Sequence, residues 1–382
     1  MERTSLPDIA PGEYRNFGEG NYYIPDELPP KKEIEVSPDI REGLENAIFQ
    51  LGRLGGIGEE AATSPLLYTT MVRREAVESV LIEGADIDIE ELFRPSQIDA
   101  TQTTAKDVQE ALNYETAIQA GAEEVQRTGE ITIPLLHRLH ETLLEGARDE
   151  ARQVGEFRRG PIHIPPPSPA EERFIPPPAR DVPRLMENLE RYIHTGNEYH
   201  NLVNCGIVHY QIETIHPYGD GNGRLGRILI TLQLIQNEYL TKPLLYPSAY
   251  FNKHKVEYVR RMRAVSEEGA WKPWLEFFIR GIAEQAEQAF ERTGELRALR
   301  REYEGEHGHE KTAADRLAMR LFQKPYVDTK TVVELLDVSD QTARDAIAAL
   351  EAKGILEETT GKQRYREYKA VDIFAILSNA GI

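Results

Sequence analysis

One cysteine, no long apolar run and a shortage of positive charge set the first limits on this chain of 382 residues. Cys205 is the only cysteine, so no internal disulfide can form, which favours a reducing compartment. No run of about twenty apolar residues occurs, so no segment is expected to cross a membrane. The opening stretch, MERTSLPDIAPGEYRNFG, lacks the apolar segment of a secretory signal. We therefore expect a soluble cytoplasmic protein.

Acidic residues outnumber lysine and arginine by 64 to 45, which leaves a formal net charge of −19 at pH 7. This excess opposes general electrostatic attraction to nucleic acid or to an anionic membrane, although it is compatible with a local basic patch. The length is sufficient for two or three domains.

The spacing of apolar residues predicts a mostly α-helical fold. The stretch before Pro38 is rich in proline, glycine and aromatic residues, which predicts an extended arm. Apolar residues then recur at helical spacing to about Gly121, again over residues 132–146, and from Val182 to about residue 303. Before Val182, RRGPIHI is typical of a short hairpin, and the proline runs after it cannot join a helix or a central strand.

The C-terminal stretch TKTVVELLDVSDQTARDAIAALEAKGILEETTGKQRYREYKAV predicts a winged helix. It has the pattern of helix, turn and helix, followed by two short strands around a Thr-Gly-Lys turn. Ser339 can cap the second helix, whose apolar face carries Ala343, Ile347 and Leu350.

The run IHPYGDGNGRLGR, residues 215–227, carries the densest group of candidate functional residues. Pro217 disfavours a helical conformation at His216, so the preceding helix should end there. A new apolar pattern begins at Leu225, so the glycines form a tight loop that leads into a helix N-terminus. Backbone N–H groups and the helix dipole favour an anion at such a site. Arg224 and Arg227 oppose that dipole unless an anion lies between them.

Other interpretations of these glycines fail on context. The run GNGRLG fits a dinucleotide-binding pattern, but a helix rather than a strand precedes it, and the lysine and Ser/Thr of a phosphate-binding P-loop are missing. DGNGR resembles the start of a calcium loop, but an arginine takes a ligand position. A plain helix–helix turn would need neither the paired arginines nor the flanking His216 and Asp220.

HPYGDGNGRLGR resembles the signature of the Fic family, H-P-F-x-D/E-G-N-G-R-x-x-R, with Tyr218 in place of phenylalanine. YYIPDELPP resembles the N-terminal domain that often accompanies Fic cores, and GEFRRGPIHI resembles the family's flap, the hairpin that holds the target segment. SAYFNKHKVEYVRRM and WKPWLEFF resemble segments that close the nucleotide pocket. The resemblance implies an N-terminal region at residues 1–100, a catalytic core at 101–303 and a winged helix at 304–382.

The resemblance also implies transfer of AMP from ATP to a Ser, Thr or Tyr hydroxyl of a target protein, with release of pyrophosphate. The residue types suit this chemistry. His216 can accept the hydroxyl proton, and Asp220 can bind Mg²⁺. Relatives that transfer a phosphate lack the second glycine and first arginine of the motif, and both are present here. The phosphate-binding candidates are Gly221, Asn222, Gly223, Arg224, Leu225, Gly226 and Arg227.

The flap and adenine assignments rest on the same resemblance. Pro161, Ile162 and His163 are the flap candidates, although an ordinary edge hairpin would explain them almost as well. Around the adenine we place three side chains, each of which could equally be a core or rim aromatic: Tyr250, His254 and Tyr258. His254 stands where relatives often carry an asparagine.

A second motif lies upstream, in ESVLIEGADI. Ser79 and Glu83 are four residues apart on a predicted helix and therefore share a face, and Gly84 can end that helix. By itself this pattern is typical of a solvated helix end. It is similar, however, to the family's inhibitory motif, Ser/Thr-x-x-x-Glu-Gly/Asn. That resemblance implies that Glu83 pairs with Arg227 and takes the place of the γ-phosphate.

Two other functions remain open from the sequence. Glu83 could orient a water that removes AMP from modified proteins, or the winged helix could make the chain a transcription regulator with a nucleotide-sensing core. The resemblance also allows a homodimer. We expect Cys205 to be a buried apolar residue and no zinc site among the histidines that we interpret as structural: His137, His140, His200 and His209.

We predict that the winged helix binds DNA weakly at most. Its second helix, from Ser339 to Lys353, is net acidic, and the basic residues lie in the wing, at Lys362, Arg364, Arg366 and Lys369. Fluorescence anisotropy of the full chain with duplex DNA at physiological salt should give only nonspecific affinity, about 10⁻⁴ to 10⁻⁶ M. Sequence-selective binding below micromolar would contradict this expectation and favour a transcription regulator.

Overall fold

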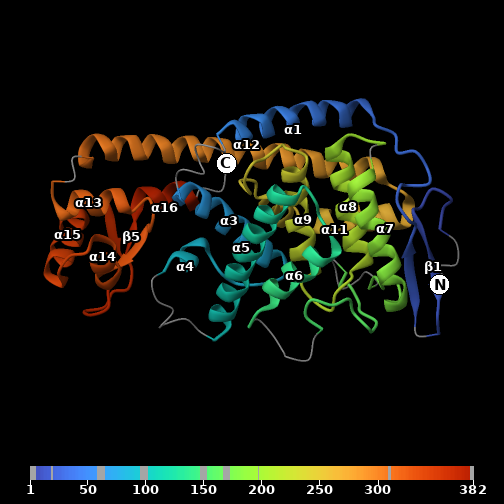
Figure 1. Ribbon diagram of the computed structural model, residues 1–382, viewed down its shortest axis with the longest axis horizontal. Helices are drawn as coiled ribbons and strands as arrows, with labels where there is room; N and C mark the ends of the chain where they lie inside the picture. The colour runs from blue at the N-terminus through green and yellow to red at the C-terminus, as the bar shows by residue number, and fades with distance from the viewer. Residues whose placement is uncertain are drawn as a thin grey trace.

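The computed structural model describes residues 6–18, 20–57, 65–94, 102–146, 153–166, 173–196, 198–308 and 311–378. Helices dominate these residues, which confirms the expected fold class (Figure 1). The domain boundary expected between residues 100 and 101 lies outside the described residues. Among the described helices, none is both long enough and apolar enough to cross a bilayer.

The N-terminal arm is extended, as expected, and it forms a hairpin. Strand β1 (Gly12–Asn16) pairs with β2 (Asn21–Pro25) in antiparallel register, with Tyr14 opposite Tyr23. β2 is buried over most of its length because it lies against the core, where the Tyr23 N–H donates to the Ile175 carbonyl at 2.8 Å. The hairpin therefore fastens the proline-rich segment before α7 to the core.

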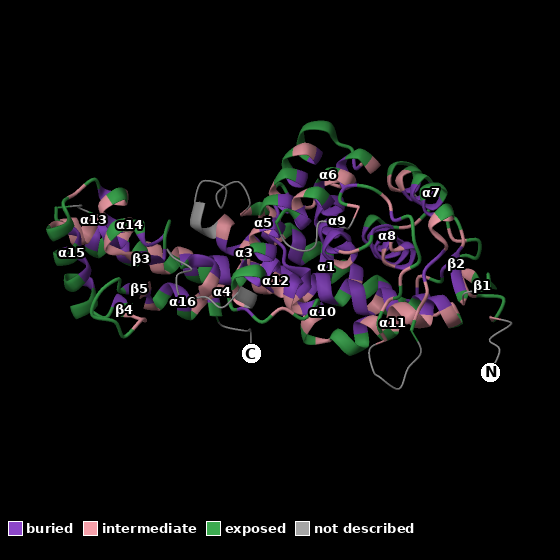
Figure 2. Ribbon diagram, turned by 90° about the horizontal axis from the view of Figure 1, so that it is seen from below, coloured by how far each residue is buried: buried purple, intermediate pink, exposed green. Residues whose placement is uncertain are grey.

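Two almost wholly buried helices form the centre of the fold, α8 (Asn201–Ile215) and α9 (Asn222–Gln236) (Figure 2). Both are buried on all faces, as expected for helices that are covered on every side. The helices that contact them include α5 (Gln102–Thr128), α6 (Ile133–Leu144) and α7 (Val182–Thr195). Cys205 lies on α8 with 1% of its surface exposed, so the expected buried thiol is confirmed.

The longest helix, α12 (Trp271–His307), runs from this core to the C-terminal domain, and α1 (Pro38–Gly56) lies along it (Figure 1). The expected division at residue 304 falls inside α12, because apolar helical spacing continues past that point. The domain limits stay a proposal. Three shorter helices and one 3₁₀ turn complete the core: α4 (Ile89–Phe93), α10 (Pro247–Lys253), α11 (Lys255–Glu268) and η1 (Ala179–Asp181).

Helix α3 (Pro65–Ile82) joins several parts of the molecule. Near its middle, the Glu75 carboxylate is completely buried and accepts hydrogen bonds from the Tyr114 hydroxyl on α5 and from Ser248 on α10. Its last turns carry Ser79 and lead to Glu83, and Gly84 follows with φ of +96°. The predicted helix end at Gly84 is confirmed.

The C-terminal domain has the expected helix-turn-helix, α14 (Thr329–Leu336) and α15 (Asp340–Ala352), followed by strands β4 (Leu356–Glu358) and β5 (Glu367–Ala370). Ser339 caps α15 by accepting a hydrogen bond from the Thr342 N–H at 3.2 Å. The sequence analysis missed α13 (Ala313–Arg320), β3 (Tyr326–Asp328) and α16 (Val371–Ser378), which are all short. β3 and β4 flank β5 in a three-stranded antiparallel sheet.

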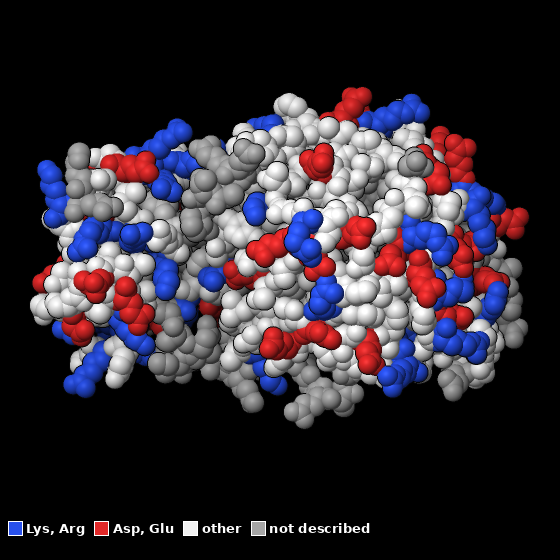
Figure 3. Space-filling view, in the orientation of Figure 1, with Lys and Arg blue, Asp and Glu red and all other residues white. Residues whose placement is uncertain are grey.

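Helix α16 returns the chain to the core. Phe374 packs edge-on against Phe93 of α4, with ring centroids 5.7 Å apart. The guanidinium of Arg74 on α3 donates to the Leu377 carbonyl at 2.8 Å, and Arg292 on α12 donates to the Ile376 carbonyl at 3.1 Å. On the face shown in Figure 3, acidic and basic side chains are interspersed.

Candidate active site

The glycine-rich loop joins the two central helices through two left-handed residues. α8 ends at His216, with φ of 51° and ψ of 63°, and α9 begins after Gly221, with φ of 72°. Pro217 stops the first helix, as the sequence predicts. No side chain among the described residues caps α9, so its first N–H groups face the loop.

Buried contacts hold this loop in one shape. The Asn222 side chain accepts from the Tyr218 N–H at 2.8 Å and donates to the Tyr218 carbonyl at 2.9 Å. The Tyr218 ring is fully buried and stacks on His140 with centroids 4.0 Å apart, and its hydroxyl hydrogen-bonds His137 at 2.9 Å. His140 accepts from the Gly155 N–H at Nδ1, so Nε2 donates to the Asp220 carbonyl at 3.0 Å. The interpretation of His137 and His140 as structural residues fits these contacts.

His216 is in the neutral state, in which a histidine can accept a proton. Its Nδ1 lies 3.1 Å from the Glu213 carbonyl, an acceptor, so Nδ1 carries the proton and Nε2 carries the lone pair. Burial lowers the pKa of His216 to about 4, despite the carboxylates of Glu83 and Asp220 nearby. The imidazole is therefore neutral at physiological pH.

Arg158, which the sequence analysis passed over, fastens the segment before the flap to this loop. Its buried guanidinium donates to the carbonyls of His216 at 2.8 Å and Pro177 at 2.6 Å, and its backbone N–H donates to the Pro217 carbonyl at 2.9 Å. The carbonyl groups at the end of α8 thus gain a cationic donor, which suits the negative end of a helix dipole. In the sequence, Arg158 is distinguished only as a basic residue next to the proline-rich segment.

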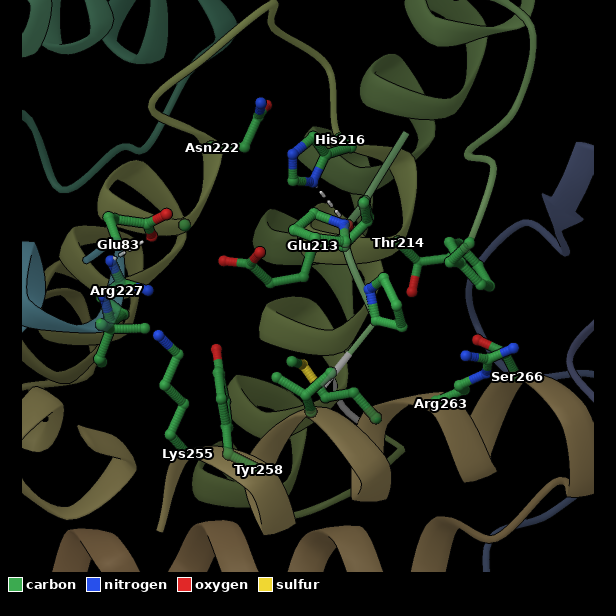
Figure 4. A pocket seen from close by; sticks show the side chains of 18 of the residues that line it. Glu83, Glu213, Thr214, His216, Asn222, Arg227, Lys255, Tyr258, Arg263 and Ser266 are labelled. Carbon is green, nitrogen blue, oxygen red and sulfur yellow. Dashed lines mark hydrogen bonds and ion pairs between the residues drawn. The ribbon is translucent and has the colours of Figure 1, made fainter. Parts of the chain in front are cut away.

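His216 lines a cavity of about 490 Å³ between the loop, α3, α11 and the flap segment (Figure 4). Arg227, Glu83 and Lys255 lie at one end, Thr214, Arg263 and Ser266 at the other, and Glu213 and His216 between them. The expected site residues that line the cavity are Glu83, His216, Asp220, Gly221, Asn222, Gly223, Arg227 and Tyr258.

Arg227 is buried, with 1% of its surface exposed, and it is bound by the end of α3. It donates from Nε to the Ser79 hydroxyl at 2.8 Å, and from one Nη to the Ser79 carbonyl at 3.0 Å and the Glu83 carboxylate at 2.8 Å. Burial opposes ionisation of Glu83, but the charge and hydrogen bond of Arg227 outweigh it and lower the Glu83 pKa. The ion pair expected between these residues is present.

The Glu83 carboxylate also lies over the first turn of α9. A Cβ atom on Gly223 would come within 2.4 Å of Glu83 Oε1, so only glycine leaves room for the carboxylate there. An anion thus occupies the positive end of α9, the position that the sequence analysis assigned to phosphate.

Arg224 differs from expectation. It is not among the described residues that line the cavity, because it turns into the core and pairs with Glu110 of α5 at 2.9 Å. Both side chains are 4% exposed. Asp220 also lies 3.8 Å from the guanidinium. Leu225 and Gly226 lie behind the loop as well, outside the cavity lining.

The residues of the flap segment that line the cavity lie further along the chain than the expected ones. Pro161, Ile162 and His163 are not among the lining residues; those from this segment are Ile164, Pro165 and Pro166, with Phe174 beyond. Residues 158–164 do not form the expected hairpin; Ile164 instead makes an isolated bridge with Phe174. Prolines cannot donate ladder hydrogen bonds, which disfavours regular strands in the described residues of this segment.

The adenine assignment also needs correction. Tyr250 is buried against Gly281 and His254 packs on Tyr250 at 4.6 Å, so neither is among the residues that line the cavity. Tyr258 does line it, and its hydroxyl donates to His209 at 2.7 Å. The other α11 side chains in the lining fall at helical spacing from Tyr258: Lys255, Val256, Val259, Met262, Arg263 and Ser266.

Comparisons with known proteins agree with this geometry. The Fic/DOC family model matches residues 130–234, and the model of the Fic/DOC family N-terminal region matches residues 41–123. A DeoR-like helix-turn-helix model matches residues 314–367. This chain carries a Fic/DOC domain. Together the two Fic/DOC matches cover the loop, α3, α6, α8 and most of α5 and α9, but not α11.

Among similar proteins are those named protein adenylyltransferase Fic of Drosophila yakuba and Drosophila melanogaster, each 27% identical over 164 residues. The match covers 42% of this chain and 29% of theirs, so this Fic chain matches under a third of those proteins. A Fic family protein from Desulfovibrio desulfuricans G20 shares the fold with a TM-score of 0.56 and 22% identity, over 88% of this chain and 97% of that one. Fic-1 (aa134 - 508) from C. elegans has a TM-score of 0.52 and 18% identity, over 69% and 74%.

Glu213 is a further acidic side chain in the cavity of this Fic protein that the sequence analysis did not single out. It lies one turn before His216 on α8, and one carboxyl oxygen is covered and has no hydrogen-bond partner among the described residues. A Cβ atom on Gly226 would come within 2.2 Å of that oxygen. Burial and the negative charge of Glu83 raise the Glu213 pKa to about 7, against the opposing effect of Arg227.

We predict that Glu213→Gln stabilises the protein at pH 8 and has little effect at pH 5. The folded state holds the Glu213 proton more tightly than the unfolded state, so the wild type loses stability as pH rises from about 4.5 to about 7. At about 1.4 kcal/mol per pKa unit, the loss above pH 7 reaches up to about 3 kcal/mol. Thermal melting at both pH values checks this, with exposed Glu42→Gln as control. A melting point that rises equally at both would contradict the assignment.

Proposed function

We propose that this Fic protein transfers AMP from ATP to a Ser, Thr or Tyr hydroxyl of a target protein and releases pyrophosphate. One observation carries the proposal: a neutral His216 faces the cavity beside the uncapped N-terminus of α9. A base and an anion site, side by side, are what attack of a hydroxyl on a phosphate requires. The relatives named protein adenylyltransferase support the same reaction.

In the proposed step, the target hydroxyl oxygen attacks the α-phosphorus of ATP, and the bond from that phosphorus to the pyrophosphate oxygen breaks. The hydroxyl proton passes to Nε2 of His216, whose Nδ1 proton stays bonded to the Glu213 carbonyl. Asn222 and Gly223 line the cavity at the start of α9, and their N–H groups can hold the α-phosphate as its charge increases.

Asp220 fits the role of a Mg²⁺ ligand in this proposal. It lines the cavity, and its Oδ1 accepts from the Gly221 N–H at 2.8 Å, which fixes the carboxylate at the phosphate site. Mg²⁺ in nucleotide sites is usually held by one or two carboxylates together with substrate phosphates. When bound, the ion would neutralise phosphate charge during transfer.

We further propose that Glu83 inhibits the enzyme. Its carboxylate neutralises Arg227 and occupies the start of α9, where polyphosphate oxygens would otherwise bind. The Glu83 side chain is 41% exposed, so in this proposal it can leave without disturbing the buried core. Ser79 supports the pair from the preceding turn, because its hydroxyl accepts from the Arg227 Nε.

We predict that His216→Ala lowers the rate of AMP transfer by about 10²- to 10⁴-fold, the usual cost of losing a general base, while ATP still binds. The phosphate site is made of other groups, so only the proton transfer is lost. Auto-modification with α-³²P-ATP measures the rate, and calorimetry measures ATP binding. Asp220→Ala should instead weaken Mg²⁺-dependent binding. Loss of ATP binding in His216→Ala would show that His216 is structural.

We predict that Glu83→Gly raises auto-modification and target labelling substantially. While Glu83 holds Arg227, the α-phosphate is misaligned, and a displacement of about 1 Å can cost roughly 10²-fold in rate. Ser79→Ala should activate more weakly, and Arg227→Ala should remain inactive in the Glu83→Gly background. Side-by-side labelling with α-³²P-ATP tests all four chains.

Equal labelling of wild type and Glu83→Gly would reject inhibition by this segment. The labelled products also test the alternative reaction. If Glu83 serves to remove AMP, purified AMP-modified target should lose its label with wild type and keep it with Glu83→Gly.

A further inference from the structure

The cations available to a polyphosphate in this cavity differ from those that the motif predicts. Arg224 pairs with Glu110 in the core, 2.9 Å away, and is not itself among the described residues that line the cavity. Arg227 lines the cavity but is held by Glu83 and Ser79. Of the two arginines that the motif assigns to phosphate binding, Arg224 therefore needs a substitute or has no such role in this protein.

Two other cations line the cavity, and they lie at opposite ends (Figure 4). Arg263 is paired with Glu267 at 3.0 Å and lies beside Ser266, away from the α9 N-terminus. Lys255 lies at the end that holds Arg227 and Glu83. Of the two, only Lys255 is placed to meet phosphate groups that extend from His216 past the α9 N-terminus toward Arg227.

Lys255 owes its position to a break between two helices. α10 ends at Lys253, His254 stands between the helices, and Lys255 is the first residue of α11. The break turns α11 so that its first turn borders the cavity, and the Lys255 side chain extends from it toward Arg227 (Figure 4). Lys255 is solvent-exposed, so its ammonium group can reach a ligand at the mouth of the cavity.

We propose that Lys255 binds the β- and γ-phosphates of ATP and takes the place that the motif gives to Arg224. The proposal rests on the proposed function for the identity of the nucleotide. An ammonium group on a flexible stem is a mobile point charge with three donors, so it can follow the polyphosphate as the leaving pyrophosphate separates. A guanidinium fixed in a buried ion pair cannot move in this way.

The position of Lys255 also gives an order of binding. Because Lys255 is exposed while Arg227 is held by Glu83, the lysine can contact the γ-phosphate before the carboxylate leaves. The incoming phosphate then competes with Glu83 for Arg227 from a position already beside it. Lys255 should therefore contribute to ATP affinity whether Glu83 is present or absent.

The test measures nucleotide binding by calorimetry in the Glu83→Gly background, with ATP and AMP as separate ligands and Mg²⁺ present. Lys255→Met should weaken ATP binding about 10- to 100-fold, the usual effect of losing a charge-assisted hydrogen bond, and leave AMP binding unchanged. Lys255→Arg should keep most of the ATP affinity. The matched control is Lys253→Met, which removes the same charge two residues away, outside the described cavity lining.

Any other outcome would contradict the proposed role of Lys255, the proposed function or both. Unchanged ATP affinity in Lys255→Met would overturn the role of Lys255, as would an equal loss for AMP or an equal loss in Lys253→Met. If the Glu83→Gly protein bound no ATP, both this proposal and the proposed function would fail. If it bound ATP but labelled no hydroxyl, the proposed function alone would fail.

Discussion

A buried positive charge at the start of a helix is the constraint around which this site is built. Arg227 is almost wholly covered, and the N-terminal end of α9 is itself electropositive. An unpaired guanidinium there would cost free energy, so Arg227 requires an anion beside it at all times. In the resting protein a carboxylate from a distant part of the chain supplies it. In the proposed reaction, phosphate oxygens would meet the same requirement once that carboxylate leaves.

The residues around the loop hold it rigid. Contacts of Asn222, His140 and Arg158 hold backbone groups of Tyr218, Asp220 and His216 in the loop. A base and an anion site can cooperate only if their separation is constant, and these contacts keep it so. The groups that border the cavity from α11 and the flap segment make fewer such contacts, and they supply the surfaces that a nucleotide would meet.

The sequence was sufficient for the helical fold, the winged helix and the loop, because each is encoded by local spacing and by residues that end or begin helices. Pro217 and the glycines specify the loop without reference to distant segments. The pairing of Glu83 with Arg227 became predictable only through resemblance to a known motif. Burial of Arg224 was not predictable in this way, because its partner Glu110 lies 114 residues away and looks like an ordinary helix residue.

All three flap candidates and two of the three adenine candidates lie outside the described cavity lining for a related reason. Both assignments depend on which face of a short, irregular segment turns toward the cavity, and a shift of one residue changes that face. Lys255 and Tyr258 line the cavity, whereas His254 packs on Tyr250. The position of Lys255 in the cavity lining could not be predicted from the sequence, because a lysine at the start of a helix is not unusual.

The docking of α16 has a consequence for how the molecule holds together. Two buried or half-buried arginines, Arg74 on α3 and Arg292 on α12, find their acceptors in the last turn of α16. Loss of that turn would remove one acceptor from each guanidinium group and so destabilise α3, the helix that carries Ser79 and leads to Glu83. We therefore expect the C-terminal helix and this part of the cavity wall to unfold as one cooperative unit, although Arg74 and Leu377 are 303 residues apart in the chain.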